Sequence, residues 1–464
     1  MNHLESQLAV LDSVEIEAIH DASLRILART GIKVPHAATL RVCAEFGAEV
    51  DHDTCIVRIP EAVMERALDR LRAAAEQPSG DNRARPLEGW VSTQVYVTDY
   101  ASNSRRLGLL EDVKKGIALV QHLRHIPQAN AVVIPSDVPA LLTDVVSFQL
   151  IYAYSRKPGS TFVLTPSSAV HILNMAHVMG RSVQFLLDTV SPLQFQEKSL
   201  EIATLFAEAG QPIGISAMVM AGGSGPVTLA GTLALENAET LACAFLVHAL
   251  TSHTPRYTAI PHSLDLRTMI CSFGSPNQAL LAIAVAQLAR RYGLVAECNA
   301  GLTDSLRPDF QAGFEKGFTG AIAALAGARA IGAQGLAGAD QGFSFEQLVL
   351  DNEWLDTYNY VIQGIAAGAE ELAEEVIASV GIGGSYLGEE HTAAHARRAY
   401  LHSKIFNRYG WDTWQKRGAK DSLAKAAEFV QMATSDCDSM DPVCTPVEYD
   451  SLHRIVQDAE REAS

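Results

Sequence analysis

The sequence alternates regularly between short apolar runs and longer segments with helical spacing, and this alternation limits the folds open to the chain. Eight apolar runs predict strands, at residues 94–99, 131–134, 161–164, 183–187, 213–219, 256–260, 294–298 and 333–337. Each run precedes a predicted helix, at residues 111–124, 139–154, 168–179, 197–209, 227–250, 277–292, 311–331 and 344–365. Eight such units predict an α/β fold, an eight-stranded (β/α)8 barrel of the TIM type.

A doubly wound open sheet is the alternative arrangement of the same units. That fold usually carries a glycine-rich phosphate turn after an early strand. The glycines of this chain gather late instead, at residues 221–225 and 335–342, and no dinucleotide or P-loop motif is present. The pattern therefore favours the barrel.

The barrel pattern is flanked by two other segments. Helical patterns and a short strand pair before residue 76 predict a compact α+β extension, and the polar stretch 77–89, with its prolines and glycines, predicts a linker. Helical, charge-rich sequence follows the eighth unit. We predict an N-terminal extension at 1–85, the barrel at 86–366, and a C-terminal helical segment that packs on it at 367–464.

Composition excludes several classes of protein. The formal net charge of −17 argues against nucleic-acid binding, because such surfaces concentrate lysine and arginine. Seven scattered cysteines without paired spacing predict reduced thiols, and the first residues lack the pattern of a signal peptide. The most apolar stretch is broken by Glu236, Asn237 and Glu239, so we predict no membrane span and a cytoplasmic protein.

In a barrel of this type the active site lies at the carboxyl ends of the strands. These ends are polar here, although any single carboxylate could instead cap the following helix. The candidates are Asp99, Tyr100, Ser136, Asp137, Thr165, Asp188, residues 218–220, His262, residues 299–304, Asp340 and Gln341.

Three other kinds of chemistry find little support in the motifs. Five potential metal ligands lack a recognisable ligand spacing, so we predict no metal site; they are His262, Cys271, Cys298, His391 and His402. No Gly-x-Ser-x-Gly turn supports a serine hydrolase, and no strand end offers the lysine of a Schiff-base aldolase.

Aromatic residues are scarce at 7%, yet two pairs flank the first and eighth predicted strands. Tyr96 and Tyr100 accompany the first strand, and Phe343 and Phe345 follow the eighth. First and last strands are neighbours in a closed barrel, so these rings could form a cage for an alkylated ammonium. Core packing explains the same four residues equally well.

Several longer stretches resemble the trimethylamine methyltransferase family, in its branch without pyrrolysine that is similar to glycine betaine methyltransferase. The stretches that carry this resemblance span nearly the whole chain. They are residues 31–34 (GIKV), 59–60 (IP), 225–233 (GPVTLAGTL), 237–239 (NAE), 273–276 (FGSP), 304–316, 346–349 (EQLV), 351–352 (DN) and 418–421 (GAKD).

The resemblance implies a barrel that moves a methyl group from a methylated amine to the cobalt(I) of a separate corrinoid protein. It implies no tightly bound cofactor and no metal of the chain's own. In the archaeal trimethylamine enzymes a pyrrolysine follows the seventh strand, and the matching position here is Gly301. We therefore assign the catalytic turn to Gly301 and Asp304.

Without pyrrolysine, the resemblance points to a quaternary amine such as a betaine, whose leaving group is already a neutral amine. Gly301 would leave space for a bulky ammonium beside the aromatic pairs. His262 and Arg267 are candidates to bind the substrate carboxylate, although Arg267 could simply pair with Asp265. A tertiary-amine methyltransferase, a non-catalytic amine-binding barrel and a homo-oligomer all stay open.

Overall fold

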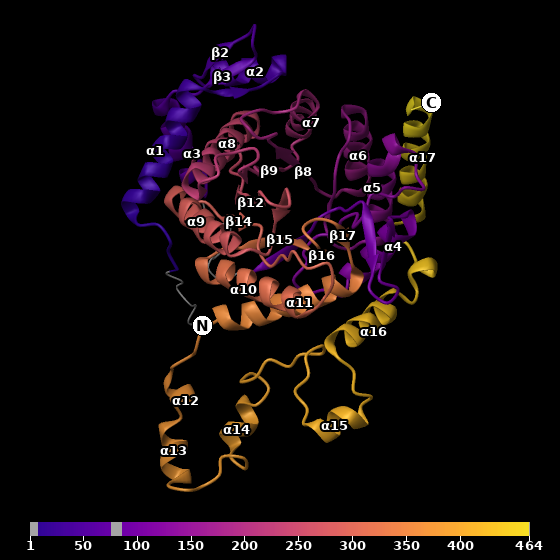
Figure 1. Cartoon of the computed structure of the whole chain (residues 1–464). Helices are drawn as coiled ribbons and strands as arrows, with labels where there is room; N and C mark the ends of the chain where they lie inside the picture. The colour runs from indigo at the N-terminus through magenta and orange to yellow at the C-terminus, as the bar shows by residue number, and fades with distance from the viewer. Residues whose placement is uncertain (1–7, 76–85, 464) are drawn as a thin grey trace.

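The computed structural model describes residues 8–75 and 86–463 (Figure 1). An N-terminal unit combines α1 (Ser13–Arg29), α2 (Ala37–Glu45) and α3 (Glu61–Ala75) with the antiparallel sheet β1 (Ile32–Lys33), β3 (Ile56–Arg58) and β2 (Glu49–Asp51). A capping box of Asp12 and Glu15 begins α1. The unit packs on the long core helix α8 (Leu229–Thr251), where the ring of Phe46 meets that of Phe245 edge-on, with the ring centroids 6.3 Å apart.

Parallel strand pairings link eight segments of the chain. One parallel set is β4 (Glu88–Val91), β15 (Ala330–Gln334), β14 (Ala296–Cys298) and β11 (Tyr257–Thr258), paired in that order. A second set is β7 (Gly159–Ser160), β8 (Val183–Asp188) and β9 (Ile213–Ser216). Isolated parallel bridges join the two sets and the segment after α4: Ala217 with Ala259, Ala129 with Gly159, and Gln94 with Val133.

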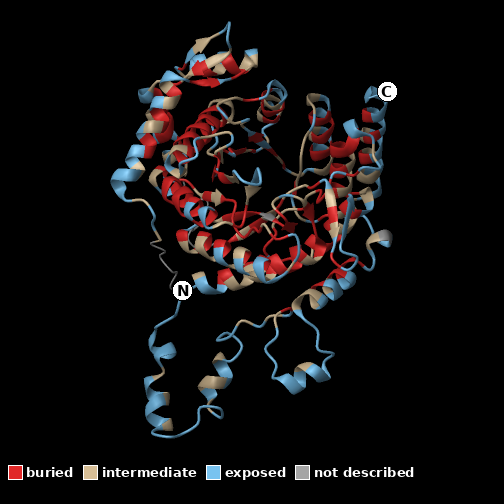
Figure 2. Ribbon diagram, in the orientation of Figure 1, coloured by how far each residue is buried: buried red, intermediate tan, exposed pale blue. Residues whose placement is uncertain are grey.

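Helices surround these strands (Figure 1). They are α4 (Leu110–Val120), α5 (Thr143–Tyr154), which the short helix η2 (Ala140–Leu142) precedes, α6 (Pro166–Met179), α7 (Glu197–Glu208), α8, α9 (Pro276–Tyr292), α10 (Phe310–Ala326) and α11 (Phe345–Ile362). Buried side chains gather on their inward faces and on the strands (Figure 2). The alternation of strand and helix predicted for residues 86–366 is confirmed as an α/β fold.

Four of the predicted strands differ from the structure. The first parallel strand is β4, and residues 94–99 contain β5 (Tyr96–Asp99), which turns back as a hairpin with β6 (Ser104–Leu107). The last parallel strand begins at Ala330 and ends at Gln334, earlier than predicted. Residues 131–134 and 161–164 form no strand, and only single bridges or the short β7 mark their positions.

Two small sheets lie beyond the parallel strands. One orders β16 (Leu336–Ala337), β17 (Gly342–Phe343), β5 and β6, and the other orders β10 (Met220–Ala221), β12 (His262–Asp265) and β13 (Ile270–Ser272). Both are built from loops that follow the parallel strands in the chain. They therefore decorate the carboxyl ends of those strands.

The C-terminal segment divides into packed and unpacked parts. Helix α16 (Ser422–Thr434) packs on α11 and α4, and α17 (Pro446–Ala463), which follows η3 (Cys437–Ser439), packs on α5 and α6. The short helices α12 (Ala369–Leu372), α13 (Glu374–Val380), α14 (Glu390–His395) and α15 (Trp411–Lys416) project away from the body (Figure 1). Within this segment, α16 and α17 are the two helices that pack on the body in this way, and the division of the chain at residue 366 stays a prediction. The predicted boundary at residue 85 lies outside the described residues.

Among the described residues, α8 alone is long and apolar enough to cross a membrane. Within its most apolar window, 83% of the helix is buried inside the structure. Its apolar composition follows from this position, since helices that are apolar all round are typical of a protein core.

Candidate active site

The side chains of β8 alternate between two environments. Val183, Phe185 and Leu187 are buried, and the ring of Phe185 lies 5.4 Å from that of Phe206 on α7, so this face packs on the helices. Leu186 and Asp188 therefore point to the opposite, inner face of the strands, as the two-residue period requires. Both are exposed, Leu186 at 46%, so solvent reaches the inner face near the carboxyl ends.

Asp188 is the last residue of β8, and its carboxyl group lies at the strand ends. Desolvation by the surrounding protein raises the pKa of its carboxyl group from 3.8 to about 7. Water that reaches the side chain opposes part of this rise. Among the described residues, no hydrogen bond or ion pair satisfies the carboxylate. Such a group favours the approach of a cation.

Two buried glutamates of α8 hold the loops around Asp188 in place. Glu239 accepts hydrogen bonds from the Thr189 and Ser191 hydroxyls (2.7 and 2.6 Å) and from the Leu193 amide (2.8 Å). Glu236 accepts from the backbone amides of Val219 (2.7 Å) and Ile260 (2.8 Å), and burial raises its pKa well above the usual value. These contacts connect α8 to the ends of three strand segments.

Trp90 is an inner-face aromatic residue that the sequence analysis missed. It lies on β4 next to Gly89, and a Cβ atom added to Gly89 would meet Leu355 of α11 at 2.7 Å, so Gly89 faces the helices and Trp90 faces inward. The Trp90 ring covers Gly332, where an added Cβ would lie 2.1 Å from the ring and 2.4 Å from Asn299 Oδ1. Gly332 is therefore needed to seat the indole. The ring remains partly accessible.

A buried ion pair fixes the turn that follows β14. Lys316 of α10 and Asp351 of α11 both have fully buried side chains, and their charged atoms are 3.1 Å apart. Lys316 Nζ also donates to the Gly301 carbonyl (3.1 Å), while Asp351 accepts from the Gly335 amide (2.7 Å) and from Gln347 (2.8 Å). Burial lowers the pKa of Lys316, and the opposite charge of Asp351 acts to raise it. The pair connects the turns after β14 and β15.

Gly301 lies inside this buried network. Its φ of +70° is in the left-handed region, and a Cβ added to it would lie 3.3 Å from Ile331 Cδ1. Its amide donates to Thr319 Oγ1 at 3.0 Å. The space that we expected above Gly301 is therefore absent, because Ile331 fills it. The role of this turn in catalysis stays a prediction.

Asp304 holds the loops together. Its carboxylate accepts hydrogen bonds from the Ser272 hydroxyl and the Phe273 amide, both at 2.6 Å, and its own amide donates to Glu315 (2.8 Å). These bonds join the turn after β14 to the β12–β13 hairpin. Asp304 thus occupies the predicted turn, with both carboxylate oxygens engaged by protein donors.

His262 is completely buried, with both ring nitrogens engaged. Nδ1 lies 2.8 Å from Gln278 Oε1, Nε2 lies 3.1 Å from the Asn299 amide nitrogen, and the ring stacks on Phe273 at 4.3 Å. Burial lowers the pKa of His262 to about 4, so the ring is neutral near pH 7. It is therefore not free to bind a carboxylate. Both His262 and Asn299 were named from the sequence as strand-end residues, but their spacing in the chain did not predict that they bind each other.

Arg267 lies on the β12–β13 turn with a side chain that is 91% exposed. It pairs with Asp265 at 3.3 Å, which is the alternative that the sequence left open. An exposed pair of neighbouring residues on a turn gives no enclosed binding position. The predicted carboxylate anchor is thus not formed by His262 and Arg267.

Two of the four predicted cage residues lie on neighbouring strands of a small sheet, Tyr96 on β5 and Phe343 on β17, where Phe343 pairs with Val97. These strands are not the first and eighth parallel strands from which the cage was predicted, and the rings face other groups. Phe343 is fully buried and meets Phe345 edge-on at 5.0 Å. Tyr100 is buried as well.

Cations of this chain already lie over the two remaining rings. The Arg105 guanidinium lies 4.5 Å from the Tyr96 ring centroid, and Lys115 Nζ lies 4.5 Å from that of Phe345. In this structure the four aromatic residues therefore pack in the core or bind protein cations, and no open cage is formed.

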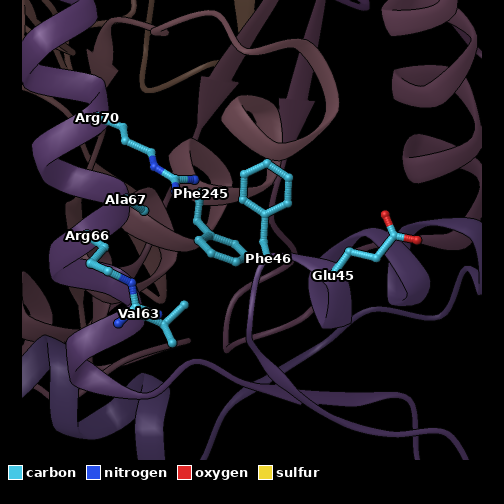
Figure 3. Close-up of a pocket in the computed structure, with 7 residues that line it drawn as sticks. All are labelled: Glu45, Phe46, Val63, Arg66, Ala67, Arg70 and Phe245. Atoms are coloured by element: carbon cyan, nitrogen blue, oxygen red, sulfur yellow. The ribbon is translucent and has the colours of Figure 1, made fainter.

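A separate pocket of about 170 Å³ lies between α2, α3 and α8 (Figure 3). Arg66 and Arg70 line it together with Glu45, Phe46, Val63, Ala67 and Phe245. Two arginines beside an apolar floor are unsuited to a cationic amine, and the pocket is remote from the strand ends. It is therefore not part of the candidate active site.

The five potential metal ligands named from the sequence are not among the residues that the structure brings together with ligand geometry in its described part. The single group with suitable spacing there is Glu17, His20 and Asp21 on α1. Glu17 binds Arg291 at 2.7 Å, and His20 binds Glu65 at 2.8 Å. These contacts explain the group as a connection between helices. The seven cysteines all lie within the described residues, and no disulfide joins any two of them.

The family model of trimethylamine methyltransferase matches residues 2–448. Trimethylamine methyltransferase MttB of Desulfitobacterium hafniense (strain DSM 10664 / DCB-2) is 29% identical over 91% of this chain and 88% of its own length. Glycine betaine methyltransferase of Desulfitobacterium hafniense (strain Y51) is 34% identical, over 53% of this chain and 52% of its own length. That second alignment spans about half of each protein.

A solved structure shares the fold. The monomethylamine methyltransferase MtmB of Methanosarcina barkeri superposes with a TM-score of 0.56, over 96% of this chain and 91% of that protein. The two sequences are 11% identical. The likeness therefore concerns the arrangement of the chain.

Proposed function

Since this chain belongs to the trimethylamine methyltransferase family, we propose that it transfers a methyl group from a quaternary amine to the cobalt(I) of a corrinoid held by a partner protein. The observation that supports a cationic amine as substrate is Asp188, a carboxylate at a strand end that water reaches and that has no hydrogen bond or ion pair among the described residues. A cationic ammonium would satisfy it.

We also propose that the eight parallel segments form a closed (β/α)8 barrel. The pairing of β4 with β15 and the bridge of Gln94 with Val133 support this closure, since both involve the first segment. Substrate would then enter at the carboxyl ends, as in other barrels of this type. The domain division at residues 85 and 366 and a cytoplasmic location stay predictions.

The corrinoid, when bound, supplies a cobalt(I) nucleophile. The chain itself has to bind the amine, orient one methyl group outward and exclude water. When the C–N bond of a quaternary amine breaks, the electron pair stays on nitrogen and a neutral tertiary amine leaves. No proton donor is then required. This agrees with His262, whose pKa of about 4 leaves the ring neutral near pH 7 and whose two nitrogens are both engaged, so it is not available as a proton donor.

The corrinoid belongs to a partner in this proposal because the family resemblance implies a separate corrinoid protein. His262, at the strand ends, has both ring nitrogens engaged and offers none to cobalt. We place the partner over the carboxyl ends, where the accessible inner-face side chains lie. The test mixes the purified chain with a cobalt(I) corrinoid and a panel of quaternary and tertiary amines, and follows the corrinoid absorbance. Turnover of tertiary amines alone would contradict the proposal.

Affinity for a quaternary amine should depend on pH through Asp188. The carboxyl pKa is raised from 3.8 toward about 7, and a cation binds the ionised form. Affinity should therefore rise as the pH increases through this range, and fall by up to about tenfold per pH unit below it. A quaternary ammonium keeps its charge at every pH, so calorimetric titration from pH 5.5 to 8.5 reports on the protein. A flat profile would argue against Asp188.

Trp90 should contribute less than Asp188 to the binding of a quaternary amine. We expect Trp90→Leu to weaken quaternary amine binding by roughly 3- to 30-fold, because an indole face attracts an alkylated ammonium. Trp354→Leu, on the outer helix α11, serves as the control. Affinity for the amine is measured by calorimetry on folded protein. Equal losses of affinity in the two variants would show that the effect comes from reduced stability and not from a contact with the amine.

A further inference from the structure

The chain between α11 and α16 forms an extended arm, residues 363–421, with almost no packing of its own. None of residues 363–404 is buried, and Ile405, at 3% exposure, pins the arm to the body between two projecting lobes. The first lobe carries α12 to α14, and the second carries α15 (Figure 1). Figure 2 shows both lobes as mostly exposed chain.

The arm is ordered into helices that cannot be stable by themselves. They span 4, 7, 6 and 6 residues, whereas isolated helices shorter than about 12 residues are marginal in water. Inside the first lobe, His395 binds the Glu370 carboxylate at 3.2 Å and His391 Nε2 lies 3.2 Å from the Glu370 carbonyl oxygen. These few exposed contacts are too weak to stabilise such short helices, so we expect the helices to pack against another surface.

Large apolar side chains of the arm face solvent. Ile382 is completely exposed, and Leu387, Ile365 and Trp411 are 90%, 86% and 67% exposed. The same arm exposes Leu372, Ile377, Tyr386, Tyr400 and Tyr409. Exposed apolar residues gathered on one projecting segment mark an interaction surface.

The two lobes carry opposite net charge. The first lobe, residues 363–404, contains six glutamates and three cations; the glutamates are Glu370, Glu371, Glu374, Glu375, Glu389 and Glu390, and the cations are Arg397, Arg398 and Lys404. The second lobe, residues 406–421, contains four cations and two acids; the cations are Arg408, Lys416, Arg417 and Lys420, and the acids are Asp412 and Asp421. Each chain therefore carries both halves of a complementary pair.

We propose that the arm is a self-association surface, in which the acidic lobe of one copy packs against the basic lobe of a second copy. In a twofold arrangement each contact occurs twice, so a segment with one acidic and one basic lobe matches itself. A partner of a single charge would satisfy only one lobe. The apolar side chains would supply the buried centre, and the charges would set the pairing.

Sedimentation velocity on the full chain tests this proposal. The wild-type protein should sediment as a dimer or a higher even multiple of 49.9 kDa at micromolar concentration. The variant Ile382→Asp with Leu387→Asp places carboxylates in the buried centre, and its dissociation constant should rise at least about 100-fold. Val447→Asp, at a residue 73% exposed on α17, is the matched control and should associate normally.

Charge exchange distinguishes self-association from a folding defect. Lys416→Glu with Arg417→Glu should weaken association, and so should Glu374→Lys with Glu375→Lys. All four substitutions in one chain should restore much of the association, because the lobes are again opposite in sign. Circular dichroism and melting temperature verify that each variant is folded.

Three outcomes would overturn the proposal: a wild-type monomer at tens of micromolar, unchanged association in the Ile382 and Leu387 variant, or charge exchange without restoration. A corrinoid partner protein that binds the wild-type chain and loses binding only in the arm variants, while the chain stays monomeric, would assign the arm to that partner and likewise refute self-association.

Discussion

Replacement of Asp188 with asparagine should remove most of the affinity for a quaternary amine. We expect KM to rise by roughly 100-fold, because the variant loses a charged contact in a partly desolvated environment while its shape is preserved. The pH dependence of binding described above should disappear with it, since asparagine does not titrate. Steady-state kinetics with a cobalt(I) corrinoid measures the first effect, and calorimetric titration across the pH range measures the second.

Asp450→Asn is the matched control for this variant. Asp450 is exposed on α17, far along the chain from the strand ends, and its replacement should change neither KM nor the pH profile. An Asp188→Asn enzyme that keeps the wild-type KM would show that the ammonium binds elsewhere. A loss confined to kcat would instead give Asp188 a role in orienting the methyl group.

Replacement of Lys316 with methionine should produce the largest loss of stability. The variant leaves Asp351 without its counter-charge where both side chains are 0% exposed, and such a change costs about 3 to 5 kcal/mol. The Gly301 carbonyl loses its donor at the same time. Urea unfolding, followed by circular dichroism, should show a lower midpoint with an unchanged slope.

Two further variants show whether the effect belongs to the pair. Lys316→Met combined with Asp351→Asn removes the buried charge and keeps an acceptor for the Gly335 amide, so it should recover part of the loss. Arg72→Met removes an exposed partner of Asp69, and should cost less than about 1 kcal/mol. Equal losses in Lys316→Met and Arg72→Met would contradict the structural role of the buried pair.

The alternation of apolar runs and helical segments was enough to predict the α/β fold, because buried parallel strands and the helices that cover them leave strong hydrophobic patterns. It was not enough to locate the first strand. Residues 94–99 have better strand composition than Glu88–Val91, yet they form a hairpin with β6. Pairing partners, which are distant in the chain, decide between two such segments.

The same error explains why Trp90 was missed. A residue is assigned to the inner face by counting along a strand, and this residue lay outside the predicted strand. Asp188 was among the polar strand ends, but the sequence could not separate it from carboxylates that cap helices or bind protein donors, as Asp304 does. Only the surrounding atoms determine whether a carboxylate remains unpartnered.

The sequence by itself therefore determined the α/β fold class and the family resemblance, since each follows from local pattern and chain order. Tertiary structure decided which groups are available to a ligand. Arg105 and Lys115 lie over two of the predicted cage rings, Ile331 fills the space beside Gly301, and Asn299 binds His262. Availability depends on contacts between residues far apart in the chain, and on the desolvation that those contacts produce.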